Sequence, residues 1–248
     1  MAARLADLYR FKFGDHSCVF YTDERELLDI VGPYILLGLQ QGERCFTAQR
    51  EEFIPSLRSY LEQNGVQVKH ALDSGRLEIH TVEDVYLSPG GFSPEEMCHL
   101  LKKEVARTAE LGFKGFRTAG DLAWVQDADT FNKLLTYECS IHDLFAGTVL
   151  SMCQYPLTTM SPTLLDAVVQ HHNIRVRPLP NERDRYGFSV RNGNFIAELI
   201  CDQRVIDAPV YYTVQRLGSN AVLSIGSEPT FDRALASARQ SLTLAASA

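Results

Sequence analysis

The sequence lacks long runs of basic and of apolar residues. Its 24 Lys and Arg are outnumbered by 31 Asp and Glu, and the formal net charge is -7. Following a nucleic-acid backbone needs clustered positive charge, so we expect no direct nucleic-acid partner. No segment reaches the roughly 18 apolar residues of a membrane-spanning helix, so we expect no membrane segment. The N-terminal segment also lacks the apolar core of a signal peptide, which favours a cytoplasmic location.

Paired cysteines are absent as well. The six cysteines stand apart without C-x-x-C spacing, and several lie inside apolar segments. This is typical of small buried side chains in a reducing compartment. With 248 residues, 45% of them hydrophobic, the chain can form one full core and a smaller second unit without disulfide or metal cross-links.

Short apolar runs alternate with helical patterns from His16 to about Arg177. Asp23 and Glu26 form a capping-box start for the first predicted helix, and Ser93-Pro94 opens a later one. Predicted strands cover residues 18–21, 44–49, 77–80, 116–120 and 148–155, and further predicted helices cover 55–64, 93–112, 128–144 and 161–171. This alternation predicts an α/β fold with a mainly parallel sheet and helices on both faces.

The pattern changes near residue 180. Two prolines and the polar segment 181–185 indicate a linker, and Asn192-Gly193 is a strong signal for a β-hairpin. Further strands are predicted at 210–216 and 221–225, followed by a helix over 230–244. We therefore predict two domains, 1–180 and 181–248, the second being a small antiparallel β-sheet with one helix.

The loop after the first predicted strand lacks glycine and lysine. It reads Tyr21-Thr-Asp-Glu-Arg-Glu26. A phosphate-binding loop needs glycines, whose backbone N–H groups surround the phosphates, and then Lys and Ser or Thr. Three carboxylates stand where the anion would have to lie, so ordinary nucleotide binding is not expected.

Six short motifs occur in order across the first domain. They are His16-Ser-Cys-Val-Phe-Tyr21, Gly38-Leu-Gln-Gln-Gly-Glu-Arg-Cys45, Ser74-Gly-Arg-Leu-Glu78, Arg117-Thr-Ala-Gly-Asp-Leu-Ala-Trp124, Tyr137-Glu138 and Cys153-Gln-Tyr155. Over about residues 16–177 the set resembles the DcmR-type sensory domain, known as MEDS. That resemblance implies a degenerate RecA/KaiC-like core, found in regulators and signalling proteins and associated with sensing small molecules such as hydrocarbon derivatives.

The likeness to KaiC extends to carboxylates. Glu51-Glu52 resemble the paired catalytic glutamates of KaiC-type enzymes, and Asp121 ends a predicted strand as a Walker B aspartate would. A water-activating acid without a phosphate-binding loop has no substrate to act on, so we predict that the chain is not an enzyme. A KaiC-like ATPase with an unusual phosphate grip stays as an alternative.

Predicted ligand-binding residues lie at the strand ends, where parallel sheets bind ligands. Arg117 and Asp121 are expected to form a buried pair, with Glu138 nearby and Trp124 above them as a mobile aromatic lid. The alternative is a salt bridge that only joins strand to helix. Tyr21 and Tyr155, with Tyr86, are candidates for aromatic walls of a pocket, although tyrosines at strand ends are also common as plain packing.

Two histidine positions are further candidates. His16 precedes the first strand, and His171-His172 end the last helix of the core, so an imidazole pair near Cys153 could hold a metal, haem or polar ligand. Since no i, i+3 or i, i+4 spacing accompanies them, hydrogen-bonded structural histidines are favoured, and we predict no metal and no cofactor.

These patterns, with what the resemblance to MEDS implies, indicate a non-catalytic sensory protein. It would bind a small, hydrocarbon-like ligand and relay its state to a signalling partner, or to a second copy of the chain through the C-terminal unit. A ligand-free interaction scaffold is the other alternative. No helix-turn-helix with basic recognition residues follows Arg177.

Overall fold

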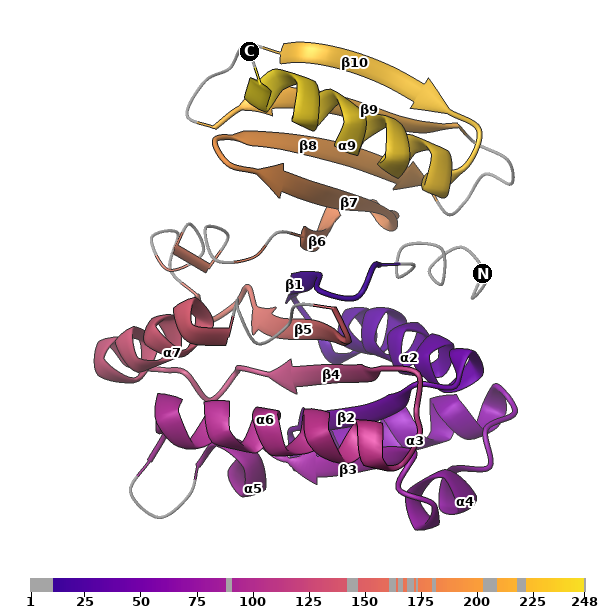
Figure 1. The fold of residues 1–248 in the computed structure, drawn as a ribbon, viewed down its shortest axis with the longest axis vertical. Coiled ribbons are helices and arrows are strands. Elements are labelled where there is room, and N and C mark those ends of the chain that lie inside the picture. The colour runs from indigo at the N-terminus through magenta and orange to yellow at the C-terminus, as the bar shows by residue number, and fades with distance from the viewer. Residues whose placement is uncertain are drawn as a thin grey trace.

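The computed structural model describes residues 11–87, 91–141, 147–160, 164, 167–168, 172, 174–179, 182–202, 209–217 and 222–247, with backbone alone at 174–179, 182–186 and 201–202. The strands within these residues are β1 (His16–Tyr21), β2 (Arg44–Gln49), β3 (Leu77–Thr81), β4 (Phe116–Asp121), β5 (Val149–Pro156), β6 (Ile174–Leu179), β7 (Glu182–Asn192), β8 (Phe195–Asp202), β9 (Val210–Arg216) and β10 (Val222–Glu228). They form one sheet in the order β10-β9-β8-β7-β6-β1-β5-β4-β2-β3 (Figure 1).

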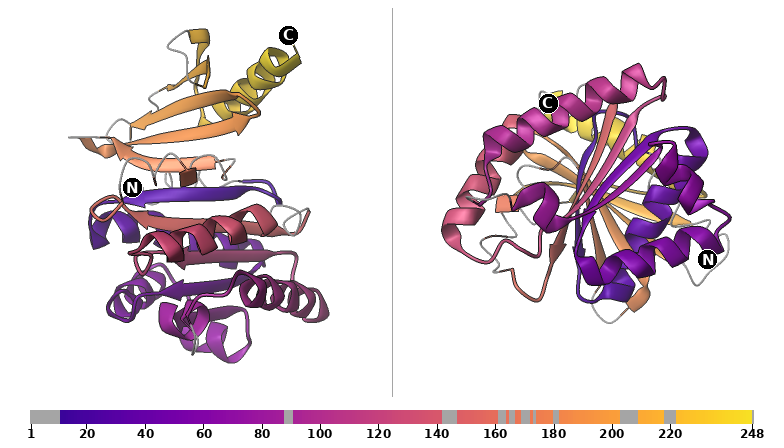
Figure 2. Two further views of the ribbon diagram at one scale, coloured as in Figure 1. Left: turned by 90° about the vertical axis from the view of Figure 1, so that its left-hand side faces the viewer. Right: turned by 90° about the horizontal axis from the view of Figure 1, so that it is seen from below.

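The first half of the sheet is parallel and is covered on both faces. β1 pairs in parallel with β5 and β6, and β4 pairs in parallel with β5 and β2. One face packs on α2 (Glu24–Gln41), α3 (Ile54–Gln63) and α4 (Val68–Asp73), and the other on α5 (Val82–Tyr86), α6 (Pro94–Glu110) and α7 (Ala128–Ile141). Figure 2 shows these helices on opposite sides of the twisted sheet. The predicted parallel α/β core is confirmed.

The helix starts follow from local chemistry. Asp23 accepts a hydrogen bond from the Glu26 backbone N–H at 2.9 Å and begins α2, which ends at Gly42 in the left-handed conformation. Ser93 caps α6, and Pro94 occupies the first turn, where its missing N–H costs nothing. The predicted helix over 161–171 lies largely outside the described residues, as do residues 142–144 of the helix predicted over 128–144. No described helix is long and apolar enough to cross a membrane.

The second half of the sheet is antiparallel. Strands β7 to β10 pair in sequence, and α9 (Phe231–Ser247) packs on the same side as α2. The β7–β8 hairpin turns at Gly193-Asn194, one residue later than the predicted Asn192-Gly193, and Gly193 has a φ of 57°. The predicted antiparallel β-sheet with a closing helix is confirmed.

The junction between the two halves differs from the sequence expectation. Residues 182–185, predicted as a linker, begin β7, and the preceding segment forms β6, a strand that the sequence did not predict. β7 pairs antiparallel with β6, so the C-terminal strands continue the main sheet. The sequence did not reveal these strands because charged residues alternate along them in place of an apolar run. The strands join the sheet through backbone hydrogen bonds. The domain boundary at 180/181 stays a prediction.

A buried arginine fastens β2 to its neighbours. Arg44 is fully buried, and its Nη2 donates to Glu104 at 2.5 Å and to Glu78 at 2.7 Å, while its Nη1 donates to Thr108 at 3.1 Å. The carboxylates come from α6 and β3, so one guanidinium joins three elements. A charge-assisted network of this kind is stable only while both signs are present.

We predict that Arg44→Met destabilises the protein by about 3–5 kcal/mol, because it leaves the buried Glu104 carboxylate without its cation. The matched control is Lys69→Met, which breaks an exposed i, i+4 pair with Asp73 and should cost less than about 0.5 kcal/mol. Denaturant unfolding of both variants measures the difference, and equal costs would contradict a structural role for the Arg44 network.

Acid should weaken the same network through Glu78. The hydrogen bond from His80, together with those from Arg44, lowers the pKa of Glu78 to about 2 from its usual 4.5. A depressed carboxyl pKa gives stability that is present above pH 4.5 and is lost as the pH falls toward 2. We predict that Glu78→Gln reduces this loss in urea-unfolding midpoints measured over that range, whereas Glu62→Gln on the exposed side of α3 leaves it unchanged.

Candidate functional site

The loop after β1 is already occupied by the chain's own carboxylates. Asp23 accepts from the Glu26 N–H, and Glu26 accepts from the Thr22 N–H at 2.8 Å and from its hydroxyl at 2.6 Å. Backbone donors at a helix N-terminus are what a phosphate would use. Here the N–H of Glu26 in the first turn and that of Thr22 just before the helix are hydrogen-bonded to two negative side chains, so an anion meets both competition and repulsion.

Asp121, at the end of β4, is likewise occupied. Its fully buried carboxylate accepts from Arg50 Nε at 2.8 Å, from the Tyr21 hydroxyl at 3.1 Å and from the Ala123 N–H at 2.9 Å. Burial and the Asp121 charge raise the pKa of Tyr21 well above its ordinary value. The carboxylate that we compared with a Walker B aspartate therefore already accepts hydrogen bonds from three donors of the chain.

The expected Arg117–Asp121 pair is wrong. Four residues along a strand separate the two Cα atoms by about 13 Å. Both side chains are on the α2 side, but Arg117 reaches the turn between α2 and β2, at the start of the strand. There its Nε donates to Glu43 at 2.5 Å, and its guanidinium lies 4.5 Å from the Tyr34 ring centroid. Glu138, expected beside the pair, faces the opposite side of the sheet.

An aromatic cluster lies on the α6–α7 side of the sheet. Trp124, in the loop between β4 and α7, stacks on Tyr86 with centroids 5.2 Å apart and contacts Phe92 at 5.0 Å. Phe92 meets Tyr137 edge to face at 5.8 Å. Trp124 Nε1 is buried and has no hydrogen-bond partner among the described residues. We call these four residues the aromatic cluster.

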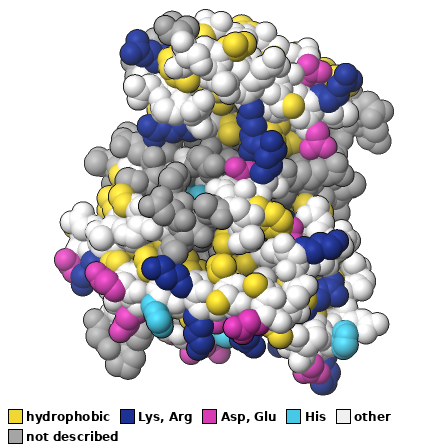
Figure 3. All heavy atoms as spheres, viewed as in Figure 1, with side chains coloured by type: hydrophobic (Ala, Val, Ile, Leu, Met, Phe, Trp, Pro, Cys, Tyr) yellow, Lys and Arg dark blue, Asp and Glu magenta, His cyan; other side chains and the backbone are white. Residues whose placement is uncertain are grey.

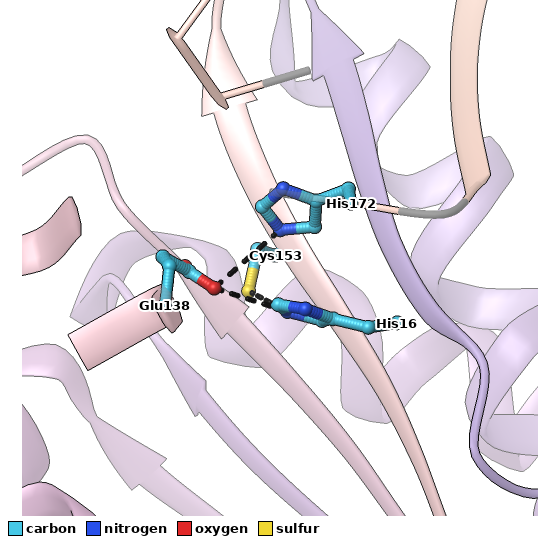
Figure 4. A group of neighbouring side chains, drawn as sticks. All are labelled: His16, Glu138, Cys153 and His172. Carbon is cyan, nitrogen blue, oxygen red and sulfur yellow. Dashed lines mark hydrogen bonds and ion pairs between the residues drawn. The ribbon is translucent and has the colours of Figure 1, made fainter. Parts of the chain in front are cut away.

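A polar cluster lies on the same face of the sheet as the aromatic one and is drawn in Figure 4. His16 Nε2 lies 3.3 Å from Cys153 Sγ and 3.2 Å from Glu138 Oε2, and His172 Nε2 lies 3.7 Å from the same oxygen. The four side chains come from β1, α7, β5 and the residue two before β6, and each is at most 8% exposed. Side-chain alternation on β1 and β5 turns His16 and Cys153 to the same face. We call these four residues the polar cluster.

Neighbouring groups orient the polar cluster. The Tyr155 hydroxyl donates to Glu138 Oε1 at 3.2 Å, and His172 Nδ1 lies 2.8 Å from the Val168 carbonyl. Burial raises the pKa of Glu138 to about 8 and the pKa of Cys153 well above its ordinary value. Two imidazoles, a carboxyl and a thiol within 4.8 Å of one another can share protons or hold a metal ion.

The predicted residues thus divide between two faces of the sheet. Tyr21, Asp121 and Arg117 lie on the α2 side, whereas His16, Glu138, Cys153, Tyr155 and Trp124 lie on the α6–α7 side. His171 lies outside the described residues, and its neighbour His172 is the one in the polar cluster. Whether these residues bind a ligand stays a prediction.

Sequence reasoning gave no role to Arg50, Phe92 or Tyr137 and treated His172 only as the neighbour of His171. The sequence could have suggested Tyr137, because it directly precedes Glu138 on α7. Arg50 reaches Asp121, and Phe92 reaches Trp124 and Tyr137, across long stretches of the chain, so no spacing rule could have found these contacts.

The fold and these groups define a RecA-like α/β core without a phosphate-binding loop, with a buried polar cluster on the α7 face of its sheet. Residues 15–173 match the family described as MEDS, the methanogen/methylotroph, DcmR sensory domain. The chain belongs to this family, which confirms the resemblance drawn from the six motifs.

Individual proteins show the same relationship. The chain is 22% identical over 171 residues to the transcriptional repressor DcmR of Methylorubrum extorquens, covering 67% of this chain and 62% of the repressor. The chain therefore spans less than two thirds of the length of this curated relative.

Two solved structures are similar. The uncharacterized protein PH0321 of Pyrococcus horikoshii, solved with an unknown peptide, has a TM-score of 0.54 at 13% identity, covering 88% of this chain and 94% of that one. The flagellar accessory protein FlaH of Methanocaldococcus jannaschii has a TM-score of 0.39 at 12% identity, covering 88% and 91%. The first score supports a shared fold, in agreement with the predicted RecA-like core.

Gly120 offers a direct test of the aromatic cluster. A Cβ at this position would collide with the Tyr86 hydroxyl, so we predict that Gly120→Ala costs about 1–3 kcal/mol and shifts the fluorescence of Trp124, the one tryptophan of the chain. Tyr86→Phe removes the colliding oxygen, so the double variant should recover at least about half of the loss. Additive costs in the double-mutant cycle would refute the packing described above.

Proposed function

We propose that this chain is a non-catalytic sensory domain that binds a small, hydrocarbon-like molecule and relays its state to a partner. Membership of the MEDS family gives it a sensory or regulatory role. The binding site that we propose is the aromatic cluster, and the observation that carries it is the buried Trp124 Nε1 without a described hydrogen-bond partner.

The chemistry of the aromatic cluster suggests the class of ligand. Its walls are aromatic faces and edges, which favour apolar molecules, and a single N–H donor would orient one acceptor oxygen. Short-chain ketones, ethers and alcohols have this combination. A buried N–H that lacks a partner costs free energy, and a ligand oxygen would remove that cost.

The rival ATPase function has less support. The carboxylate that would serve as its Walker B aspartate, Asp121, is hydrogen-bonded to Arg50 and Tyr21. Arg50 also pairs at 3.0 Å with Glu52, which is one of the two glutamates that resemble those of KaiC. Binding Mg²⁺ and a triphosphate would require these bonds to break and the loop after β1 to release its own carboxylates.

The C-terminal strands are suited to a relay. β6 pairs with β1 on one edge and with β7 on the other, so a shift near the polar cluster reaches the antiparallel half through backbone hydrogen bonds. Apolar side chains are exposed there: Tyr211 is 56%, Leu223 52% and Ile225 72% exposed. Figure 3 shows basic and acidic side chains of the described residues interspersed over one face, with apolar groups between them. We expect this surface of β9 and β10 to contact a signalling protein or a second copy of the chain.

The proposal predicts that short-chain ketones or alcohols quench or shift Trp124 fluorescence and raise the melting temperature saturably, whereas ATP with Mg²⁺ does neither. Phe92→Leu, which removes one aromatic wall, should weaken binding about tenfold, or about 1.4 kcal/mol. Phe53→Leu, at a buried phenylalanine on the α2 side, is the matched control and should leave affinity unchanged.

Three results would count against the proposal. Indifference to a broad panel of small molecules would favour the scaffold, and binding unchanged by Phe92→Leu would place the ligand elsewhere. Saturable binding of ATP with Mg²⁺ would restore the ATPase alternative.

A further inference from the structure

The polar cluster is assembled from four separate parts of the fold. Its donor atoms are two imidazole nitrogens, a carboxylate oxygen and a thiol sulfur, all within 4.8 Å of one another. No two of these residues share a helix, so sequence spacing predicted no metal site. Burial of so many polar groups at one point has a large cost unless something compensates for it.

The separations fit a tetrahedral ion. Ligands at the bond lengths of zinc to nitrogen, oxygen and sulfur lie about 3.3–3.7 Å apart along the edges of a tetrahedron. The distances from His16 to Cys153 and Glu138 are 3.3 and 3.2 Å, and that from His172 to Glu138 is 3.7 Å. Three of the six edges are therefore within about 0.5 Å of the tetrahedral lengths before any ion is present.

The surroundings also match those of metal ligands. Metal-bound histidines usually donate their second ring N–H to a carbonyl or carboxylate, and His172 Nδ1 lies 2.8 Å from the Val168 carbonyl with Nε2 toward the cluster. Tyr155 holds Glu138 Oε1, which leaves Oε2 facing both histidines. These contacts select the atoms that point inward.

The donor set indicates the class of ion. A thiolate and two imidazoles suit zinc and its first-row neighbours, whereas magnesium and calcium prefer oxygen ligands alone. One divalent cation would also balance one carboxylate and one thiolate, leaving the buried site neutral. We propose that His16, Glu138, Cys153 and His172 bind one divalent transition-metal ion, for which Zn²⁺ is the best match.

This inference goes beyond the proposed function, because a metal ion could occupy the polar cluster whether or not the aromatic cluster takes a ligand. Four protein ligands leave no open position, which is typical of structural zinc sites. His172 lies two residues before β6, so the ion would tie the start of that strand to β1, β5 and α7. Metal loading should therefore slow amide hydrogen exchange in β6.

The test uses the full chain, stripped with a chelator and then titrated with Zn²⁺ against a chelating dye. We expect one tightly bound ion per chain. Co²⁺ in its place should give the intense visible bands of a tetrahedral site and a near-ultraviolet thiolate-to-cobalt charge-transfer band. Cys153→Ala should abolish the charge-transfer band, and Cys45→Ala, at a buried cysteine on the opposite face, should keep it.

Two conservative variants protect the test against simple misfolding. Glu138→Gln keeps the shape of the side chain and should weaken Zn²⁺ binding more than about 100-fold, whereas Tyr155→Phe, which removes only the hydroxyl bonded to Glu138 Oε1, should weaken it about tenfold. His70→Gln, at an exposed histidine of α4, should bind as the unmodified chain does. A stripped chain that binds no stoichiometric Zn²⁺ would show that the cluster is only hydrogen-bonded, and equal affinity in Glu138→Gln and the unmodified chain would overturn the assignment.

Discussion

Strand β1 is the constraint on which both groups of polar residues depend. It lies between β5 and β6, and the alternation of its side chains sends His16 to the α7 face and Tyr21 to the α2 face. A shift of one residue in its register would exchange these faces and separate His16 from Cys153 and Tyr21 from Asp121. Because β1 is paired on both edges and buried on both faces, its register is strongly specified.

Side chains of this protein occupy the edge of the sheet where related folds bind phosphate. Asp23 accepts from the Glu26 N–H at the start of α2, Glu26 accepts from the Thr22 N–H, and Arg50 pairs with Asp121. The acidic side chains that would repel a phosphate therefore also make hydrogen bonds within the chain. The sheet edge is consequently a closed, hydrogen-bonded structure, and the buried groups that could meet a ligand lie on the other face of the sheet.

The two halves of the molecule share one sheet and are joined by strand pairing. His172 precedes β6, and β6 carries β7 by antiparallel hydrogen bonds. Any change that moves His172 relative to β1 acts on the strand that begins the C-terminal half. The exposed apolar residues of β9 and β10 lie at the far end of the same hydrogen-bonded series.

Local chemistry in the sequence determined the elements that carry their own signals: the Asp23 and Ser93 caps, the Asn192-Gly193 hairpin, the alternation of strands and helices, and the acidic loop after β1. Tertiary structure alone decided the partners. Arg117 meets Glu43 rather than Asp121, Arg50 reaches Asp121, and His172 joins His16, Cys153 and Glu138, because contacts between distant segments depend on strand order and face. The sequence also did not predict β6, because this strand has no apolar pattern of its own and is positioned by backbone pairing with β1 and β7.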